Sequence, residues 1–250
     1  SKAFEEYPNT AMKILFWVRD VRGGAGERRV FRNIIDYLAS NHTETMRKNL
    51  ELISEYGRWD DILLLLDTKL RKEVSEIIRK AIFVDNNALA AKWMPRPNNK
   101  NTHKKRWAKK LMVDWGMSPK EYRKALTKYT DVVESKMCSK NWVSIDYGKI
   151  PSRAMSDYMG AFDRNDSERF NKYIEDLKEG KEKINADAVY PYDIIRSIKH
   201  NSNKQGAAEQ WKALPNYMEN NNERMIPVID TSGSMDMASS GSVSCMDIAV

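Results

Sequence analysis

The sequence predicts a mainly α-helical protein, an α-solenoid of HEAT-like helical repeats, with the first strand and metal loop of an α/β domain near its C-terminal end. Apolar residues recur three and four positions apart along most of the chain, which is the spacing of one helix face. The helical segments are short and separated by tight turns, as in stacked antiparallel helix pairs. No segment before Met225 has the pattern of a β-strand. Because no sequence repeat of fixed period is present, an irregular helical bundle is the alternative.

Glycines and prolines divide the first part of the chain into helices. Helical periodicity covers the segments 12–18, 30–38, 46–53, 62–66 and 74–93, and Pro95 and Pro97 end the last of them. The glycine-rich segment 23–26 breaks the chain between the first two helices. It lacks the Lys-Ser/Thr pair of a Walker loop, and no strand precedes it. We therefore interpret it as an inter-helix turn rather than a phosphate cradle.

The helices of the second part follow polar loops. After the loop 98–102, Trp107, Leu111 and Trp115 recur at four-residue spacing on one predicted helix. Ser118 and Glu121 form a capping box that starts the next helix, with Pro119 at its first position. Helical spacing continues to Met137, the segment 142–150 is irregular, and further helices are expected at 155–162, 170–177, 191–200 and 205–219.

The positive charge of the chain is concentrated in one window. The net charge is +7, and residues 86–113 contain no Asp or Glu while carrying more Lys and Arg than this net value. Such a local excess is typical of a surface that binds nucleic acid. The residues predicted to contact RNA are Lys92, Arg96, Lys100, His103, Lys104, Lys105, Arg106, Lys109 and Lys110.

Two details favour RNA over the alternative interpretation, a solvated helix face. Lys104, Lys105 and Arg106 fall in the first helical turn after the predicted cap at 101–102, where the helix dipole disfavours cations. A phosphate bound there would be favoured both by free N–H groups and by the side chains. His103 and Trp107 are also interleaved with the cations, as in sites where bases stack. Since Trp107 shares a helix face with the neighbouring apolar residues, however, we expect it in the core.

A candidate metal site follows an apolar run near the C-terminal end. Residues 226–229 predict a buried strand of a parallel sheet, which leads directly into Asp230, Ser232 and Ser234. Ligands of open α/β sheets bind at the carboxyl ends of strands. A carboxylate and two hydroxyls are hard oxygen ligands of the kind that Mg²⁺ takes while keeping several waters. A polar Ser/Gly turn is the alternative.

No other pattern indicates chemistry. Asp60 and Asp61 are adjacent carboxylates, and Asp60 is expected to cap or to form a local salt bridge. No nucleophile has a base partner, so we expect a protein that is not an enzyme. No run approaches the ~18 apolar residues of a membrane span. The two cysteines, Cys138 and Cys245, lie far apart and favour a reducing compartment. The opening residues lack the pattern of a cleavable signal.

Four motifs together resemble a known group of proteins. They lie at 21–28 (VRGGAGER), 56–61 (YGRWDD), 91–96 (AKWMPR) and 230–235 (DTSGSM). In this order they resemble an uncharacterised family of viruses, phages, bacteria and plants that is related to the Ro autoantigen, or TROVE, proteins. The last motif also resembles the metal-ion-dependent adhesion site of von Willebrand factor A-type domains.

The resemblance implies a fold and a function. In Ro-type proteins a ring of helical repeats is closed by a von Willebrand A-type domain and binds small structured RNAs and the ends of misfolded RNAs. It implies a helical-repeat domain at 1–222 and the truncated start of a von Willebrand A-type domain at 223–250. The family's later Thr and Asp ligands have no counterpart here, so we expect the chain to continue beyond Val250, and any Mg²⁺ site within it to be incomplete.

The sequence supports two candidate functions, which belong to different classes. The first is a Ro-like RNA-binding protein of the cytoplasm, or of the host cytoplasm or virion if the protein is viral, that binds structured small RNA through a basic helical surface. The second is a protein–protein scaffold or structural component of a virus particle. In that case a protein partner would donate a carboxylate to the metal site.

Overall fold

The computed structural model describes residues 2–200, 203–216, 219, 222–224, 226–240 and 243–249. It divides the chain into two compact units, Ser1–Ser135 and Lys136–Val250. This division falls inside the stretch that the sequence analysis treats as one helical domain. The prediction of a mainly helical protein is confirmed, since the described residues before 224 form helices and connecting segments and no strand. No helix in the described part of the chain combines the length and the apolar character needed to cross a membrane.

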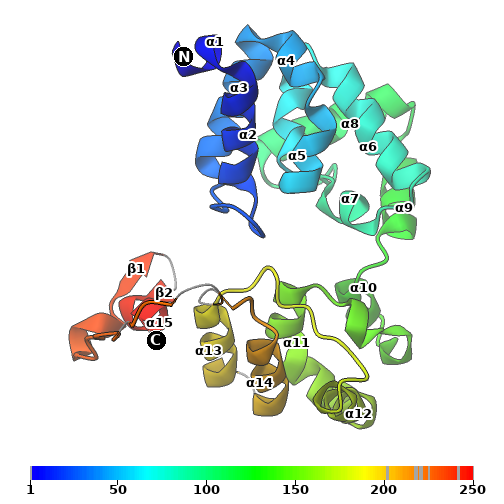
Figure 1. Cartoon of the computed structure of the whole chain (residues 1–250). Helices are drawn as coiled ribbons and strands as arrows, with labels where there is room; N and C mark the ends of the chain where they lie inside the picture. The colour runs from blue at the N-terminus through cyan, green and yellow to red at the C-terminus, as the bar shows by residue number, and fades with distance from the viewer. Residues whose placement is uncertain are drawn as a thin grey trace. The chain divides into compact units, whose positions relative to one another are not determined.

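The first unit is a set of helices (Figure 1). In chain order these are α1 (Lys2–Glu6), α2 (Pro8–Arg19), α3 (Arg29–Asn41), α4 (Thr43–Arg47), α5 (Leu50–Tyr56), the 3₁₀ helix η1 (Ile62–Asp67), α6 (Arg71–Phe83), α7 (Ala88–Trp93), α8 (Thr102–Trp115) and α9 (Pro119–Tyr129). Helix α10 (Val133–Cys138) spans the boundary between the units.

The core of the first unit is organised around η1. This segment packs against α3, α5, α6 and α8. Ile62, Leu65 and Leu66 are completely buried. The helical run predicted at 62–66 is a 3₁₀ helix. Since the segment ends at Asp67, it places a carboxylate at the edge of the core.

The glycine-rich segment is an inter-helix turn, as predicted. It connects the end of α2 to the start of α3. A Cβ at Gly24 would lie 1.8 Å from the carbonyl oxygen of Trp17, so only glycine fits this close backbone approach. Gly26 has a φ of 66°, in the left-handed region that glycine adopts without strain.

Helix ends follow the predicted caps, with one correction. The Asn101 side chain accepts a hydrogen bond from the Lys104 N–H, and Ser118 forms the reciprocal capping box with Glu121. The helix predicted at 74–93 is instead two helices, α6 and α7. Asn86 has a φ of 52° between them, and the Asn87 side chain caps α7. The periodicity does not reveal this break.

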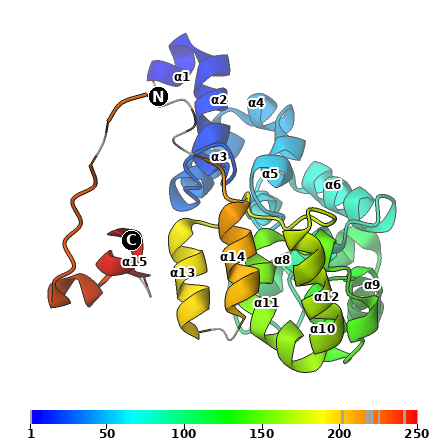
Figure 2. The same cartoon turned by 60° about the horizontal axis from the view of Figure 1, so that its bottom comes forward.

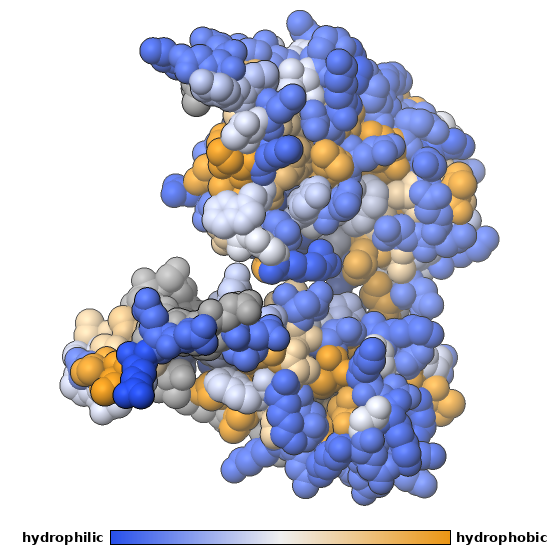
Figure 3. Space-filling model, in the orientation of Figure 1, coloured by the Kyte–Doolittle hydropathy of each residue, from blue (hydrophilic) through white to orange (hydrophobic). Residues whose placement is uncertain are grey.

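The second unit contains η2 (Trp142–Ser144), η3 (Tyr147–Lys149), α11 (Ser152–Asn165), α12 (Ser167–Lys178), α13 (Pro191–His200) and α14 (Lys204–Lys212). Helices α13 and α14 lie side by side in the views of Figures 1 and 2. Tyr147 packs its ring against Phe170 and Phe162, with centroids 5.1 and 5.2 Å away. The visible face of each unit is mostly hydrophilic, with separate apolar areas (Figure 3).

The strand predicted at 226–229 is not formed. Residues 226–230 have no regular secondary structure, and Ile226 and Val228 are 88% and 95% exposed. A buried parallel strand needs neighbouring strands on both sides. The described part of the chain supplies only an antiparallel pair, β1 (Ala238–Ser240) and β2 (Val243–Ser244). Met225 lies outside the described residues.

The described chain ends in two short helical segments. The loop after residue 230 forms a short 3₁₀ helix, η4 (Gly233–Asp236), and the described chain ends in α15 (Cys245–Ala249). The side chains of Ser244 and Asp247 each accept a hydrogen bond from the other's backbone N–H at 3.0 Å. This capping box starts the helix and uses the carboxylate of Asp247.

Candidate nucleic-acid interface

The predicted RNA-contacting cations fall into three groups in the structure. The first group is exposed and makes no side-chain hydrogen bond or ion pair with the described residues. Its members are Lys100, Lys104, Lys105 and Lys109. Most of them belong to α8, whose first turn carries Lys104 as predicted. This group is available to an anionic partner.

The second group is held against Asp67. The Nζ of Lys110 lies 2.6 Å from Oδ1 of Asp67, and the guanidinium of Arg106 contacts Oδ2. The indole N–H of Trp107 donates to the same carboxylate at 2.9 Å. Trp107 itself is 9% exposed, which confirms its predicted place in the core. Two of the predicted RNA-contacting cations, Arg106 and Lys110, are therefore used inside the protein, because they join α8 to η1.

The third group is Lys92 near the end of α7 and Arg96 in the segment between α7 and α8. Lys92 donates to Glu134 at 2.7 Å. Arg96 is half-buried, and its Nη1 is buried without a hydrogen-bond partner among the described residues. Burial lowers the pKa of Arg96, against a small opposing effect of Tyr122. A buried guanidinium N–H without a partner is costly, and an anionic ligand would satisfy it.

Two adjoining cavities bring Lys92, Arg96, Lys104 and Arg106, but not Lys100, Lys105, Lys109 or Lys110, together with arginines at the start of α3. Their volumes are about 600 and 640 Å³. Both are lined by Arg32, Leu64, His103 and Trp107, so they form one continuous depression. We call it the basic groove. Its Lys, Arg and His residues are Arg28, Arg29, Arg32, Lys92, Arg96, His103, Lys104 and Arg106, and its carboxylates are Asp36, Asp60 and Asp67.

A buried ion-pair network fixes one wall of the basic groove. Asp61 is completely buried and accepts from Nε of Arg19 at 2.9 Å and from Nε of Arg32 at 2.6 Å. Asp60 accepts both Nε–H and Nη2–H of Arg58, at 2.8 and 2.7 Å, which confirms its predicted local salt bridge. Because Asp61 holds one edge of the Arg32 guanidinium, this side chain has a defined position in the groove.

The electrostatic environment of the groove is positive. Burial lowers the pKa of Arg28, and the neighbouring charges of Arg58 and Arg32 lower it further. The guanidinium of Arg58 lies 4.2 Å from the ring centroid of Trp93, in a cation–π contact. A bound anion would offset the repulsion that these neighbouring cations exert on Arg28.

The arginines at the start of α3 were not predicted from the sequence. Arg28, Arg29 and Arg32 lie outside the acid-free window. A count of charges along the sequence does not show that they lie next to the cations of that window in space. A signal was nevertheless present. The motifs at 21–28, 56–61 and 91–96 supply Arg28, Asp60 and Arg96 to the lining of the same groove.

The three predicted metal ligands come together at the surface. The Ser232 N–H donates to Asp230 at 2.8 Å, and the Ser232 and Ser234 hydroxyls lie 2.9 Å apart. The backbone hydrogen bond from Ser232 lowers the pKa of Asp230. These oxygens fit Mg²⁺ in kind, although they supply only part of its octahedral ligand set. Across the described residues there is no cluster of three or more His, Cys, Asp and Glu that could hold a metal ion.

Comparisons with known proteins identify relatives of unassigned function. A family model described as "Domain of unknown function (DUF2828)" matches residues 1–115 and 86–235. An uncharacterized protein of Acanthamoeba polyphaga mimivirus is 27% identical over 283 residues, which cover 94% of this chain and 50% of the relative. The chain thus spans about half the length of that curated relative. The comparison with solved structures found no match.

Proposed function

This chain belongs to the DUF2828 family, and from that premise we propose that it binds structured RNA through the basic groove and the exposed lysines of α8. The observation that carries the proposal is the convergence of three separate sequence segments on one groove. The lining of the basic groove contains seven Lys and Arg side chains and three carboxylates. Two of these carboxylates, Asp60 and Asp67, are already paired with arginine or lysine inside the protein.

The geometry suits a phosphate backbone. Arg28 and Arg29 approach from the start of α3, while Lys104 lies in the first turn of α8, whose N–H groups favour an anion. Arginine forks pair with phosphate oxygens in a bidentate manner. Contacts of this kind fix the position of a nucleic acid without reading its sequence. The proposal is therefore recognition of RNA shape and charge.

The proposal also includes the arrangement of the helices, the relationship to other protein families and the location of the protein. They are the HEAT-like stacking of the helices, the relationship to Ro-type proteins with the start of a von Willebrand A-type domain, and a location in the cytoplasm, the host cytoplasm or the virion. The presence of a viral relative supports the last of these. The proposed role is binding and includes no catalytic step.

A scaffold role is the second candidate. The observation that favours it is the exposed cluster of Asp230, Ser232 and Ser234. With Mg²⁺ bound, such a cluster would leave coordination positions for a carboxylate donated by a protein partner. This candidate predicts an association that a metal chelator abolishes.

The test measures binding of a structured RNA at two salt concentrations, with and without chelator. Groove binding predicts that affinity falls steeply with salt and is insensitive to chelator. The double variant Arg28→Gln/Arg29→Gln should weaken binding about 10-fold or more, since two exposed phosphate contacts are lost. A control, Lys120→Gln/Lys124→Gln on α9, removes the same charge from exposed residues outside the groove. Equal affinity of the two double variants would contradict the groove.

A further inference from the structure

The two cavities of the basic groove differ in their chemistry. The cavity of about 600 Å³ is lined mostly by charged side chains. The cavity of about 640 Å³, which we call the α7 cavity, has an apolar wall built from η1, α8 and the end of α7. The residues of this wall are Leu63, Leu64, Trp93, Met94, Pro95 and Trp107. A cavity of this size that combines apolar side chains with a few polar groups is typical of a small-molecule site.

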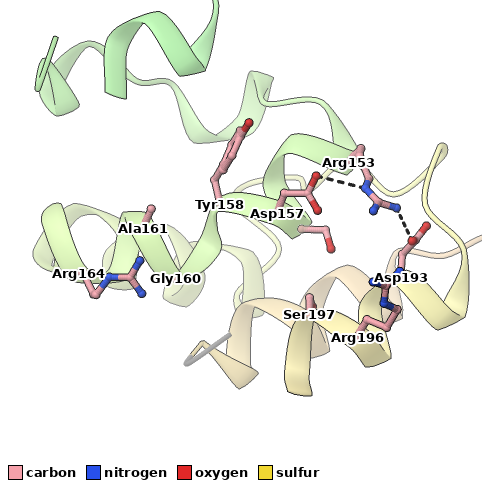
Figure 4. Close-up of a pocket in the computed structure, with 10 residues that line it drawn as sticks. Arg153, Asp157, Tyr158, Gly160, Ala161, Arg164, Asp193, Arg196 and Ser197 are labelled. Carbon is pink, nitrogen blue, oxygen red and sulfur yellow. Dashed lines mark hydrogen bonds and ion pairs between the residues drawn. The ribbon is translucent and has the colours of Figure 1, made fainter. Parts of the chain in front are cut away.

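Arg96 carries a charge in the α7 cavity that the protein leaves uncompensated. Its side chain is half-buried, its Nη1 has no hydrogen-bond partner, and none of the described carboxylates pairs with it. Arg153, which lines a cavity of the second unit, shows the opposite arrangement, since it pairs with Asp157 and Asp193 (Figure 4). A guanidinium that is buried without a counter-charge costs free energy, and a bound anion would offset this cost.

Two asparagine amides add oriented donors to the lining. The side-chain oxygen of Asn99 accepts the Asn101 backbone N–H at 2.9 Å, and the side-chain oxygen of Asn101 accepts the Lys104 N–H at 3.1 Å. Because these bonds engage both oxygens, they also fix which end of each amide carries the NH₂ group. Neither NH₂ group makes a hydrogen bond with the described residues, so both remain available to an acceptor on a ligand.

The same hydrogen bonds hold the donors in one compact loop. The Asn99 N–H donates to the Arg96 carbonyl at 3.1 Å, and the chain continues through the two asparagine bonds to Lys104 in the first turn of α8. Lys104 is exposed, and its side chain makes no hydrogen bond or ion pair with the described residues. Two uncompensated cations and two amide donors therefore line the α7 cavity from a single stretch of nine residues, 96–104.

From these features we propose that the α7 cavity binds a free mononucleotide. The base lies against the apolar wall, and the phosphate faces the loop that carries Arg96 and Lys104. The other Lys, Arg and Asp residues of the lining, which are Lys92, Arg32 and Asp60, are paired within the protein. The two uncompensated cations thus match the two negative charges of a phosphomonoester. This inference goes beyond the proposed RNA binding, because its ligand is a small molecule.

Calorimetric titration of the whole chain tests the ligand class. The probes are AMP, UMP, adenosine and inorganic phosphate. AMP and UMP should both bind, because stacking and apolar contacts tolerate any base. Adenosine and inorganic phosphate should each bind about 10-fold more weakly or less, since each lacks either the charged or the apolar contact. Inorganic phosphate that binds as tightly as AMP would overturn the proposal, because the apolar wall would then have no part in binding.

Two variants and one control test the site itself. Arg96→Gln should weaken AMP binding about 10-fold or more, because a charge-assisted contact is lost. Trp93→Leu removes an aromatic ring from the apolar wall and should weaken AMP binding about 5-fold or more. Arg123→Gln, which removes an exposed charge of α9 outside the cavity, should leave the affinity within about two-fold. Circular dichroism checks that each variant is folded.

The outcomes separate this inference from RNA binding. It is overturned if no nucleotide binds, or if the folded Arg96→Gln and Trp93→Leu variants bind AMP as the wild type does. If AMP does not bind while Arg96→Gln weakens binding of structured RNA, Arg96 serves the RNA interface alone, and only the proposed function stands. AMP binding that depends on Arg96, in a chain that binds no structured RNA, would support the α7 cavity and contradict the proposed function.

Discussion

Arg19 and Asp61 form a buried ion pair, with Nε and Oδ2 separated by 2.9 Å and with side chains that are 6% and 0% exposed. The same carboxylate accepts the Arg58 backbone N–H at 2.9 Å and contacts Arg32. It therefore connects α2, α3 and the segment before η1. Removing one partner of such a pair leaves an uncompensated charge in the interior, which costs more than the pair contributes.

We predict that Asp61→Ala lowers the free energy of unfolding by about 3–5 kcal/mol, because Arg19 is left buried without its carboxylate. Urea denaturation followed by circular dichroism measures the change. Glu44→Gln is the control, since Glu44 pairs with Arg47 at the surface, where its side chain is 76% exposed. Its effect should stay within about 1 kcal/mol. Similar losses for the two variants would contradict the structural role of Asp61.

The glycine turn between α2 and α3 gives a second prediction. A Cβ at Gly24 would overlap the Trp17 carbonyl oxygen, whereas a Cβ at Gly23 would lie 3.4 Å from Asp20, at ordinary contact distance. Gly24→Ala should lower the free energy of unfolding by more than about 1 kcal/mol, while Gly23→Ala should be nearly neutral. RNA affinity should fall with Gly24→Ala as well, because the turn positions Arg28. Thermal unfolding of both variants compares them directly, and an equal loss would rule out the proposed close contact.

Local features of the fold could be predicted from the sequence, and long-range ones could not. The Asn101 and Ser118 caps depend on residues within one helical turn, so their prediction succeeded. The pairing of Lys110 with Asp67 joins residues 43 positions apart, and no local pattern reports it. The predicted strand at 226–229 relied on an apolar run alone. Such a run does not specify the neighbouring strands that would bury it.

The same limit applies to the candidate site. The acid-free window identified the α8 side of the basic groove through composition alone. Its α3 side was missed because Arg28 and Arg32 lie outside the acid-free window, in a segment whose pattern indicates only a helix. Their approach to His103 is a property of tertiary packing. The shared motifs were the better guide, since they supply residues from three segments to one groove.

Asp67 predicts a pH dependence of stability. Burial alone would raise its pKa, but hydrogen bonds from Lys110, Trp107 and Arg106 hold it below the ordinary value of 3.8. A carboxyl group whose pKa is depressed on folding stabilises the fold above its unfolded pKa, and this contribution is lost as pH falls through the folded pKa. The difference in unfolding free energy between wild type and Asp67→Asn should therefore be full near neutral pH and shrink below 3.8. Urea titrations across this range measure it. A difference that does not change with pH would mean that Asp67 contributes through shape rather than charge.

The loop that carries Asp230, Ser232 and Ser234 gives a prediction about Mg²⁺ binding by residues 1–250 alone. Asp230, Ser232 and Ser234 offer three exposed oxygens, and Mg²⁺ requires near-octahedral geometry with six. Calorimetric titration of residues 1–250 with Mg²⁺ should show at most weak binding. Tight binding that disappears in Asp230→Asn would contradict this expectation. It would also strengthen the scaffold candidate, because the loop would then be a working metal site.

The last prediction concerns the exposed lysines of α8. Lys104, Lys105 and Lys109 are solvent-exposed and unpaired with any described residue, so changing all three to glutamine should leave the fold and its stability nearly unchanged. If they contact phosphates, affinity should fall about equally for different structured RNAs. The slope of log affinity against log salt should flatten by about two to three units, since fewer counterions are released.

A triple variant on α9 provides the matched control for those lysines. Lys120, Arg123 and Lys124 are equally exposed and lie outside the groove, so their change to glutamine removes the same charge from the same unit. Filter binding or fluorescence anisotropy at several salt concentrations gives both slopes. If the control flattens the slope as much as the α8 variant does, the RNA responds only to net charge. Affinity that is unchanged in a folded α8 variant would contradict contacts at these lysines and leave only the groove arginines Arg28, Arg29 and Arg96.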